Sequence, residues 1–235
     1  DDGVEISYRN NRTGESGSLK GAYCLSSIPG VLLGRIDNNF PEDARAALKD
    51  ANTRPAVRFA YQANRRFWQN DENQIYGGMS FLDNPLSEVW YPSSGFHMEK
   101  GGLMGGFYLR DEATRVGKLP IRERIAEARK LGSKIHPEIL DDAIVPGDLA
   151  LSLAWQQLPG EEGMVTLYHR QESYERMLIP FGERFFMIGC QAAPLRGWVE
   201  GALMSVEHVL QQIGANRATT IAGLRNDPQA RYMLA

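Results

Sequence analysis

The clearest chemical signal in the sequence is a strand-like run followed by a helix that starts at a glycine. Residues 183–189 read as a buried strand, and a loop from Cys190 leads to Gly197-Trp198-Val199-Glu200-Gly201-Ala202. Backbone N–H groups at a helix start, with the positive end of the helix dipole, suit an anionic or electron-rich ligand. Gly197 permits close approach and Trp198 offers a flat wall. A core helix with a packing tryptophan would explain the same residues.

Other residue types give weaker signals. The glycine-rich run 101–106 lacks the Gly-x-Gly-x-x-Gly spacing and lies inside a strand pattern, which favours close backbone approach over phosphate binding. No Gly-x-Ser-x-Gly elbow occurs. The histidines have no metal-ligand spacing, and we expect no metal site and only structural or surface roles for His97, His136, His169 and His208.

Composition excludes several classes of protein. The chain has 235 residues and a net charge of −3, which argues against a basic nucleic-acid-binding protein. No apolar run approaches the roughly 20 residues of a membrane helix, so we expect no membrane span. The two cysteines, Cys24 and Cys190, lie far apart, which excludes a zinc ribbon and a disulfide-dense scaffold and leaves the compartment open.

The elements that would position these residues form a mixed α+β pattern. Two strand-like runs, 4–8 and 19–26, flank a Gly-rich turn and predict a hairpin. Turn residues between the next strand-like runs predict an antiparallel meander. The remaining expected strands are 56–68 (which ends in an aromatic corner), 75–81, 88–91, 103–109 and 149–158, and the expected helices are 41–51, 120–131, 172–178 and 198–214.

Four segments, taken in order, carry a resemblance to a known family. They are the strand and helix start just described, Ala56–Gln62 running into Arg65–Trp68, Ile75–Ser80 followed by Val89–Ser93, and Ile28-Pro29 after a strand. Together they resemble the flavin-containing amine oxidase family, and its L-amino-acid oxidase branch in particular. The resemblance covers roughly residues 3–213.

The resemblance implies the C-terminal half of a two-domain FAD-dependent amine oxidase fold. Residues 1–40 and 170–215 would belong to the FAD-binding domain, residues 50–165 to a substrate domain with a mixed sheet, and residues 216–235 to a C-terminal extension. The family's dinucleotide-binding motif is not in this sequence. We therefore expect an N-terminal partner chain that carries it, made by cleavage of a precursor and assembled as a dimer of heterodimers; an excised fragment is the alternative.

The same resemblance assigns roles residue by residue. The cofactor-binding residues would be Gly189 and Cys190 in the loop after the strand, and Gly197, Trp198, Val199 and Glu200 at the helix start. Trp198 would also act as a catalytic wall, and Gly197 would offer its carbonyl to the substrate amine. Arg58 would be the second catalytic residue. The substrate pocket would be lined by Phe107, Leu109 and Tyr91, with Gly197 and Trp198.

The implied reaction is the oxidative deamination of an L-amino acid. A hydride passes from the α-carbon of a neutral amine to FAD, the imine hydrolyses, and O2 reoxidises the flavin to give H2O2. The chain departs from the family at Arg58, where a lysine is usual, and at Cys190, where a glutamate is usual; Arg and Lys are not equivalent. A flavin-dependent monooxygenase that gives the amide, and a non-catalytic partner chain of the same fold, remain alternatives.

Overall fold

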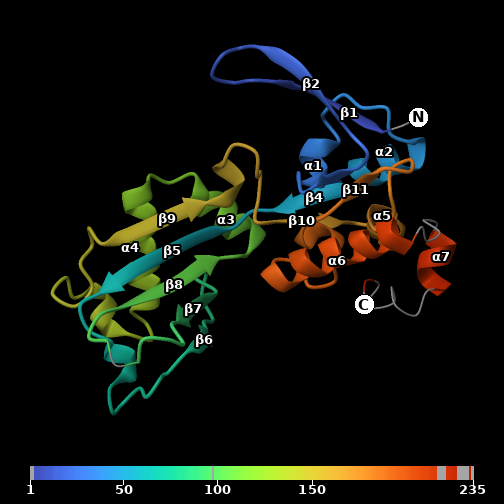
Figure 1. Ribbon diagram of the computed structural model, residues 1–235. Helices are drawn as coiled ribbons and strands as arrows, with labels where there is room; N and C mark the ends of the chain where they lie inside the picture. Colours follow the sequence, from blue (N-terminus) through green and yellow to red (C-terminus); the bar gives the residue numbers. More distant parts are fainter. Residues whose placement is uncertain (1–2, 97, 216–220, 227–232, 234–235) are drawn as a thin grey trace. The chain divides into compact units, whose positions relative to one another are not determined.

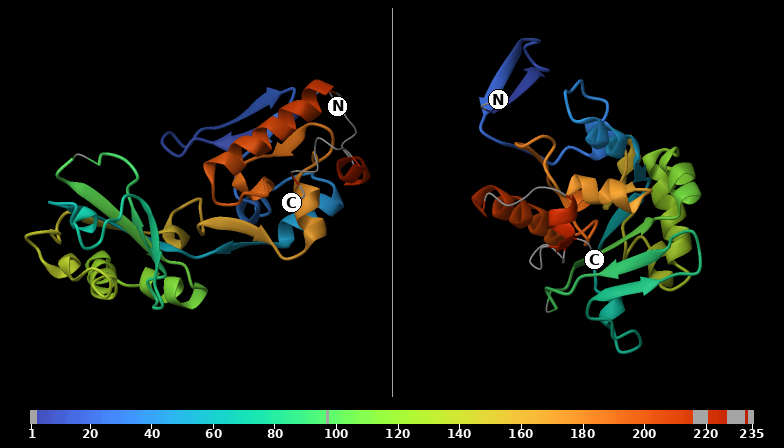
Figure 2. Two further views of the ribbon diagram at one scale, coloured as in Figure 1. Left: turned by 90° about the horizontal axis from the view of Figure 1, so that it is seen from below. Right: turned by 90° about the vertical axis from the view of Figure 1, so that its right-hand side faces the viewer.

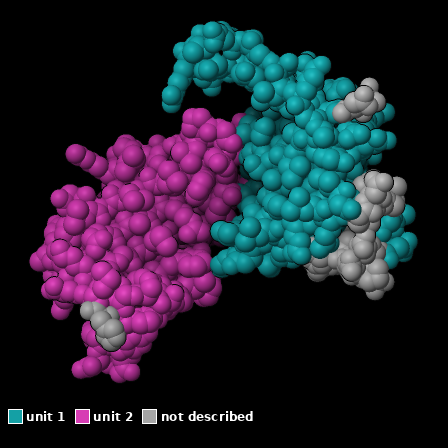
Figure 3. Space-filling model, in the orientation of Figure 1, with its two compact units in different colours: residues 1–53, 165–235 teal, residues 54–164 magenta. Residues whose placement is uncertain are grey.

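The computed structural model describes residues 3–96, 98–215, 221–226 and 233. The chain divides into two compact units: unit 1 is residues 1–53 with 165–235, and unit 2 is residues 54–164 (Figure 3). Of the expected C-terminal extension, helix α7 (Ile221–Asn226) and Met233 are described; the rest, like His97, lies outside the described residues.

Unit 1 begins with the expected hairpin. Strands β1 (Val4–Arg9) and β2 (Ser16–Gly21) pair antiparallel, with Val4 opposite Gly21 and Arg9 opposite Ser16. Almost every residue of both strands is exposed, and the hairpin projects from the rest of the unit in Figure 1 and in the right-hand view of Figure 2. The single strand expected at 19–26 is wrong: β2 ends at Gly21, and a separate strand, β3 (Cys24–Ser26), pairs elsewhere.

The core of unit 1 joins segments that are far apart in the sequence. Strand β3 pairs in parallel with β11 (Phe185–Met187), and β4 (Ala51–Arg54) pairs with β10 (Val165–Tyr168). Phe40 contacts Phe181 and Phe185 at ring-centroid distances of 5.0 and 4.7 Å. The other elements are α1 (Gly30–Leu33), α2 (Glu42–Lys49), α5 (Gln171–Met177), the short 3-10 helix η4 (Cys190–Ala192) and α6 (Val199–Ala215).

Unit 2 is built on a five-stranded sheet with the order β6-β7-β8-β5-β9. Every pair of neighbours is antiparallel, so the mixed sheet that the resemblance implies for this region is wrong for these five strands. This arrangement extends the expected meander, because β5 lies between β8 and β9. The strands are β5 (Val57–Ala63), β6 (Gly78–Phe81), β7 (Glu88–Tyr91), β8 (Gly101–Phe107) and β9 (Ala150–Ala154).

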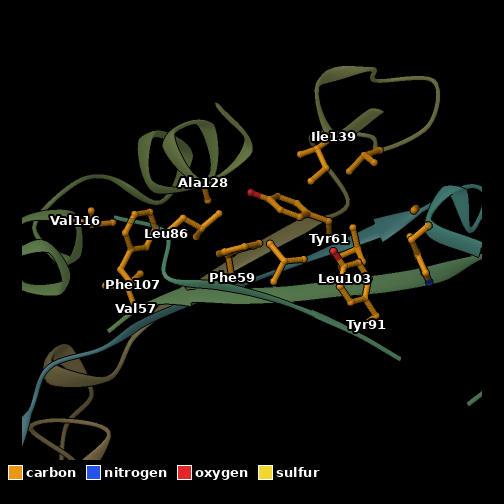
Figure 4. Packing of buried hydrophobic residues seen from close by; sticks show 14 of the residues in the cluster. Val57, Phe59, Tyr61, Leu86, Tyr91, Leu103, Phe107, Val116, Ala128 and Ile139 are labelled. Atoms are coloured by element: carbon orange, nitrogen blue, oxygen red, sulfur yellow. The ribbon is translucent and has the colours of Figure 1, made fainter. Parts of the chain in front are cut away.

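One face of this sheet packs against helices. Burial alternates along β5, with Val57, Phe59 and Tyr61 buried and Arg58 half-buried, as the two-residue period of a strand requires. Figure 4 shows the buried side chains pointing from the sheet towards Val116 and Ala128. The helices of the unit are α3 (Arg110–Gly117), α4 (Ile121–Gly132) and the 3-10 helices η1 (Phe67–Gln69), η2 (Pro137–Leu140) and η3 (Trp155–Gln157).

The differences from the expected elements in unit 2 occur at strand ends. Strand β8 ends at Phe107 rather than at residue 109, because Leu109 is the N-terminal cap of α3, a helix that the sequence pattern missed. Similarly, β9 ends at Ala154 and the chain turns into η3. Both changes occur at short segments directly after a strand, where hydrophobic periodicity gives little signal.

Candidate functional site

The first group of candidate residues lies in unit 1, at the edge where its two parallel strands end. The register pairs Met187 with Ser26, and the N–H of Ile188 donates to the carbonyl of Ser26 at 2.9 Å. Since both strands end at this edge, the loops after β3 and β11 lie together. Ligands of α/β proteins bind outside such carboxyl ends. Gly189 and Cys190 are therefore well placed to contact a ligand.

A buried glutamine that sequence analysis missed holds these two loops together. Gln191 accepts a hydrogen bond from the N–H of Gly30 at 2.8 Å and donates one to the carbonyl of Ile28 at 2.9 Å. The motif residues Ile28-Pro29 are thereby fixed to the loop after β11. A glutamine four residues beyond a strand carries no sequence signal of its own, so its role emerges only from the contacts.

The loop after β11 is also fixed to α6. Gly189 has a φ of +95°, in the region that favours glycine, and its N–H donates to the Ser205 hydroxyl oxygen at 2.8 Å. The same hydroxyl donates to the carbonyl of Ala202 at 2.6 Å. The Cys190 thiol is free and half-buried. The structure thus brings the loop that holds Gly189 and Cys190 to the N-terminal half of α6.

The start of α6 presents its first turn to solvent. Gly197 has a φ of +84°, and a Cβ at this position would meet no atom within 4 Å. The Trp198 side chain is 55% exposed and that of Val199 is 73% exposed. Gly201 is required for close packing, because a Cβ there would lie 2.0 Å from the carbonyl oxygen of Leu195. The first-turn N–H groups have no partners within the helix itself, so they can donate to a ligand.

The second group lies in unit 2, on the sheet face opposite the helices. We call this the open face. Arg58 is there because it alternates with the buried Val57 and Phe59. Its guanidinium carbon lies 5.7 Å from the centre of the Trp90 ring and 5.5 Å from that of Tyr108, distances typical of cation–π contacts. The three residues form one cluster.

Charges beside Tyr108 act on its hydroxyl in opposite directions. Burial raises the pKa of Tyr108 to about 12, and the neighbouring Glu88 carboxylate acts in the same direction. The positive charge of Arg58 acts against them and lowers the pKa of that group. At neutral pH the tyrosine is therefore protonated, so its hydroxyl can donate or accept a hydrogen bond.

Two residues assigned to the substrate pocket lie on the other side of the sheet. Phe107 is 1% exposed and Tyr91 is 6% exposed, and both belong to the core that packs against the helices. The Tyr91 hydroxyl is 2.7 Å from Nε2 of His136 and 2.9 Å from Oγ of Ser80. We therefore correct the assignment: the residues next to them, Trp90 and Tyr108, share the open face with Arg58. Leu109 is 58% exposed at the start of α3.

The glycine-rich run permits close approach, as expected. A Cβ on Gly101 would lie 2.8 Å from the Trp68 ring, and one on Gly105 would lie 2.4 Å from the Glu88 carbonyl oxygen. Of the histidines, His136 and His208 are buried and bonded to protein groups. Over the part of the chain that the structure describes, no cluster of three or more His, Cys, Asp or Glu could hold a metal ion.

Comparison with known proteins identifies the family. The model of the flavin-containing amine oxidoreductases matches residues 1–209. The chain belongs to this family. It is 23% identical over 168 residues to an L-amino-acid oxidase from Notechis scutatus scutatus. The matched region covers 70% of this chain and 32% of that protein.

Solved structures of family members show the same fold. Putrescine oxidase bound to putrescine matches with a TM-score of 0.70 and 15% identity, over 84% of this chain and 44% of that one. A variant of the same enzyme matches with a TM-score of 0.71, again over 44% of its length. The chain thus has part of the fold of a flavin-dependent amine oxidase and spans less than half the length of these relatives. None of the described helices is both long enough and apolar enough to cross a membrane.

The residues of unit 1 fit a flavin. Gly197 leaves open space where a side chain would stand, and the exposed N–H groups of the following turn suit an electron-rich carbonyl. The glycine at 189 keeps the loop after β11 free of side-chain bulk. These features require only backbone atoms, so the change from the family's usual glutamate to Cys190 leaves them in place.

Proposed function

We propose that this chain is the C-terminal part of an enzyme that uses FAD to deaminate an L-amino acid oxidatively. Family membership supports the flavin and the amine, and the L-amino-acid oxidase relative supports the substrate class. The observation that carries the proposal is the start of α6, where Gly197, the exposed Trp198 and the first-turn N–H groups follow the loop after β11.

In this proposal unit 1 binds the cofactor. The N–H groups of Val199 and Glu200 would hold the electron-rich pyrimidine edge of the flavin, where the helix dipole favours negative charge. Gly189 and Cys190 would contact the cofactor beyond that edge. When bound, the flavin supplies a two-electron acceptor for the hydride on the substrate's α-carbon.

The chain's own residues would orient the substrate amine and exclude water from it. The Trp198 ring would form one wall of the site, and the Gly197 carbonyl would accept a hydrogen bond from the amine N–H. In unit 2 we assign substrate contacts to Arg58, Trp90 and Tyr108 on the open face. We also assign one to Leu109, which follows Tyr108 in the sequence. Fixing the amine in one orientation lowers the entropic part of the barrier.

We further propose that a second polypeptide segment carries the dinucleotide-binding motif. The relatives are two to three times as long as the part of them that this chain matches, and the 235 residues contain no Gly-x-Gly-x-x-Gly. A partner chain produced from a common precursor, assembled as a dimer of heterodimers, would supply it. Mass spectrometry of the natively purified protein would identify that partner and its stoichiometry.

The first test is a visible absorption spectrum of the natively purified protein. We expect flavin bands that bleach when mixed L-amino acids are added without oxygen. Bands that persist would contradict an amino acid as the substrate. The lack of flavin bands with the partner chain present would favour the non-catalytic alternative.

Product analysis in air separates the two flavin reactions. An oxidase yields a keto acid, ammonia and H2O2, because the imine leaves the flavin before reacting further. A monooxygenase yields the amide and carbon dioxide, because the oxidised carbon is still held when oxygen reacts. We expect peroxide and keto acid; amide as the main product would establish the monooxygenase instead.

A further inference from the structure

We propose that the outward side of α6 is the docking surface for the segment that carries the dinucleotide-binding motif, and that the helix after that motif packs along it. This proposal rests on the proposed function, which assigns the motif to a second polypeptide segment. It is carried by the orientation of α6, a helix whose apolar side faces solvent and whose polar side faces the interior of unit 1.

Helix α6 has one continuous apolar side. With 3.6 residues per turn, six of its apolar residues fall within about 100° of the helix circumference. These residues, which we call the apolar arc, are Val199, Ala202, Leu203, Val206, Leu210 and Ile213. In a soluble protein, a helix side of this width and composition faces a hydrophobic core.

The apolar arc is not covered within unit 1. Leu203 is 65% exposed and Leu210 is 57% exposed, and Val199 at the start of the helix is 73% exposed. The other three residues of the arc are half-buried. Within the described residues, none of the six packs against the hydrophobic core of unit 1. Helix α6 runs along the outside of that unit in Figure 1. A continuous exposed apolar surface of this kind is typical of a protein interface.

The opposite side of α6 is polar and bonded to unit 1. Ser205, His208 and Gln212 are 1%, 4% and 9% exposed. Ser205 binds the N–H of Gly189, as described above. Nε2 of His208 lies 3.0 Å from the carbonyl oxygen of Leu178, and Nε2 of Gln212 donates to the same oxygen at 3.1 Å. These contacts fix the rotation of α6 about its axis, because turning the arc inward would leave buried polar groups without partners.

The occupant of the arc is inferred from the small part of a parallel sheet that unit 1 contains. Strands β3 and β11 pair in parallel over three residues, and within the described ranges no further strand joins them. Parallel sheets normally have several strands and are covered by helices on both faces. The chain matches 44% of the putrescine oxidase and 32% of the L-amino-acid oxidase, so more than half of each relative lies outside the match.

A segment with the dinucleotide-binding motif would supply both missing parts. The motif joins a strand to a helix, in a unit that adds a parallel strand to a sheet and packs its helix over the sheet. Such a helix is apolar on the side that meets its neighbours. The arc runs for about 20 Å along α6, which suits a second helix better than a loop.

Site-specific cross-linking of the natively purified protein tests which segment covers the arc. Leu203 or Leu210 is replaced by the photoreactive residue p-benzoylphenylalanine, and the cross-linked tryptic peptides are sequenced by mass spectrometry. We expect both positions to cross-link to the stretch directly after a Gly-x-Gly-x-x-Gly sequence. The control position is Glu172, which is exposed on α5 and should not cross-link to that stretch.

Substitution on the arc provides a second readout. Because Leu203 is largely exposed in this chain, Leu203→Glu should cost little within unit 1 itself. If a partner helix covers it, the buried carboxylate should lower the melting temperature of the natively purified protein by about 5 °C or more. The matched control is Glu207→Gln, exposed one turn along the same helix, which should melt within about 1 °C of the wild type.

Several results would overturn the proposal. Cross-links from the arc to residues 54–164, cross-links to a second copy of this chain, or no cross-links would each show that the motif segment does not cover α6. A melting temperature of Leu203→Glu equal to that of Glu207→Gln would show that the arc stays in solvent.

The result is separable from the proposed enzyme function. If the arc cross-links to the segment after the motif but the protein neither holds flavin nor reacts with amino acids, the docking surface stands and the enzyme assignment falls. If flavin bleaches with amino acids while the arc cross-links elsewhere, the enzyme assignment stands and the docking surface falls.

Discussion

At the scale of single residues, three side chains in the core of unit 2 are joined by a short series of hydrogen bonds. His136 is 3% exposed, and its Nε2 lies 2.7 Å from the Tyr91 hydroxyl, which in turn lies 2.9 Å from the hydroxyl of Ser80. A buried polar group without such a partner costs about 1–3 kcal/mol. These hydrogen bonds therefore fix the orientation of Tyr91 in the core, and they explain why this tyrosine does not face a substrate.

The same histidine makes the stability of the protein depend on pH. Burial lowers the pKa of His136, although Glu138 acts in the opposite direction. In the unfolded chain a histidine titrates near pH 6.5. Because the unfolded state then binds the proton more readily, this contribution to the free energy of unfolding is fully present above about pH 6.5 and decreases as the pH falls below that value.

Urea unfolding measured between about pH 7.5 and 5.5 checks this. His136→Gln should lower stability at neutral pH and flatten the decrease towards acid. His169→Gln, at an exposed position, should reproduce the wild-type pH dependence. A His136→Gln variant that retains the full wild-type slope would contradict the assignment.

The exposed Trp198 gives a residue-scale prediction about activity. Because its side chain is 55% exposed, its removal leaves the core of unit 1 intact. Trp198→Ala should raise KM or lower kcat for the amino-acid substrate, with an effect of about tenfold on kcat/KM, and leave the melting temperature nearly unchanged. Steady-state kinetics and thermal melts of the Trp198→Ala variant test this prediction. Wild-type kinetics in this variant would remove Trp198 from the site.

At the scale of elements, the start of α6 packs closely against the loop that precedes it. A side chain at Gly201 would collide with the carbonyl oxygen of Leu195, which is backbone and cannot move aside cheaply. Farther along the same helix, a Cβ at Gly214 would meet no atom within 4 Å. The two glycines thus have different roles, and only the first sets how the helix meets the loop before it.

This difference predicts opposite effects of the same substitution. Gly201→Ala should destabilise the protein by about 1–3 kcal/mol through overpacking and should lower the amount of bound flavin. Gly214→Ala should stabilise it by about 0.5–1 kcal/mol, since alanine favours a helix. Chemical denaturation and flavin absorbance measure both effects. Equal responses of the two variants would show that the contact with Leu195 does not position α6.

At the scale of the whole molecule, the chain crosses between two units only at residues 53–54 and 164–165. Unit 2 is therefore continuous in sequence, and it has its own hydrophobic core between sheet and helices. Its two ends meet, because the N–H of Met164 donates to the carbonyl of Arg54 at 2.8 Å. Unit 1, in contrast, is assembled from two separate segments.

We therefore expect residues 54–164 to fold as an isolated fragment. A continuous unit of this kind, with a single core, satisfies the requirements for an independent domain. The fragment should show a cooperative thermal transition and a near-ultraviolet circular dichroism signal from its buried aromatic residues. A non-cooperative melt would mean that unit 2 depends on contacts outside itself.

The sequence by itself determined the local elements and the family. Hydrophobic periodicity located α2, α4 and α6, and the motif at Gly197–Ala202 indicated both the resemblance and the helix start. These features depend on residues close together in the chain, where spacing alone decides the structure. Helix α3 and the ends of β8 and β9 were missed, since tertiary context sets where an exposed segment leaves a strand.

Only the tertiary structure decided which face of the sheet each side chain occupies. Side chains alternate along a strand, so a shift of one position exchanges the core face for the open face. The sequence indicated Tyr91 and Phe107, whereas the pairing of β7, β8 and β5 places their neighbours Trp90 and Tyr108 beside Arg58. Strand partners far apart in the chain set that phase, and no local pattern records it.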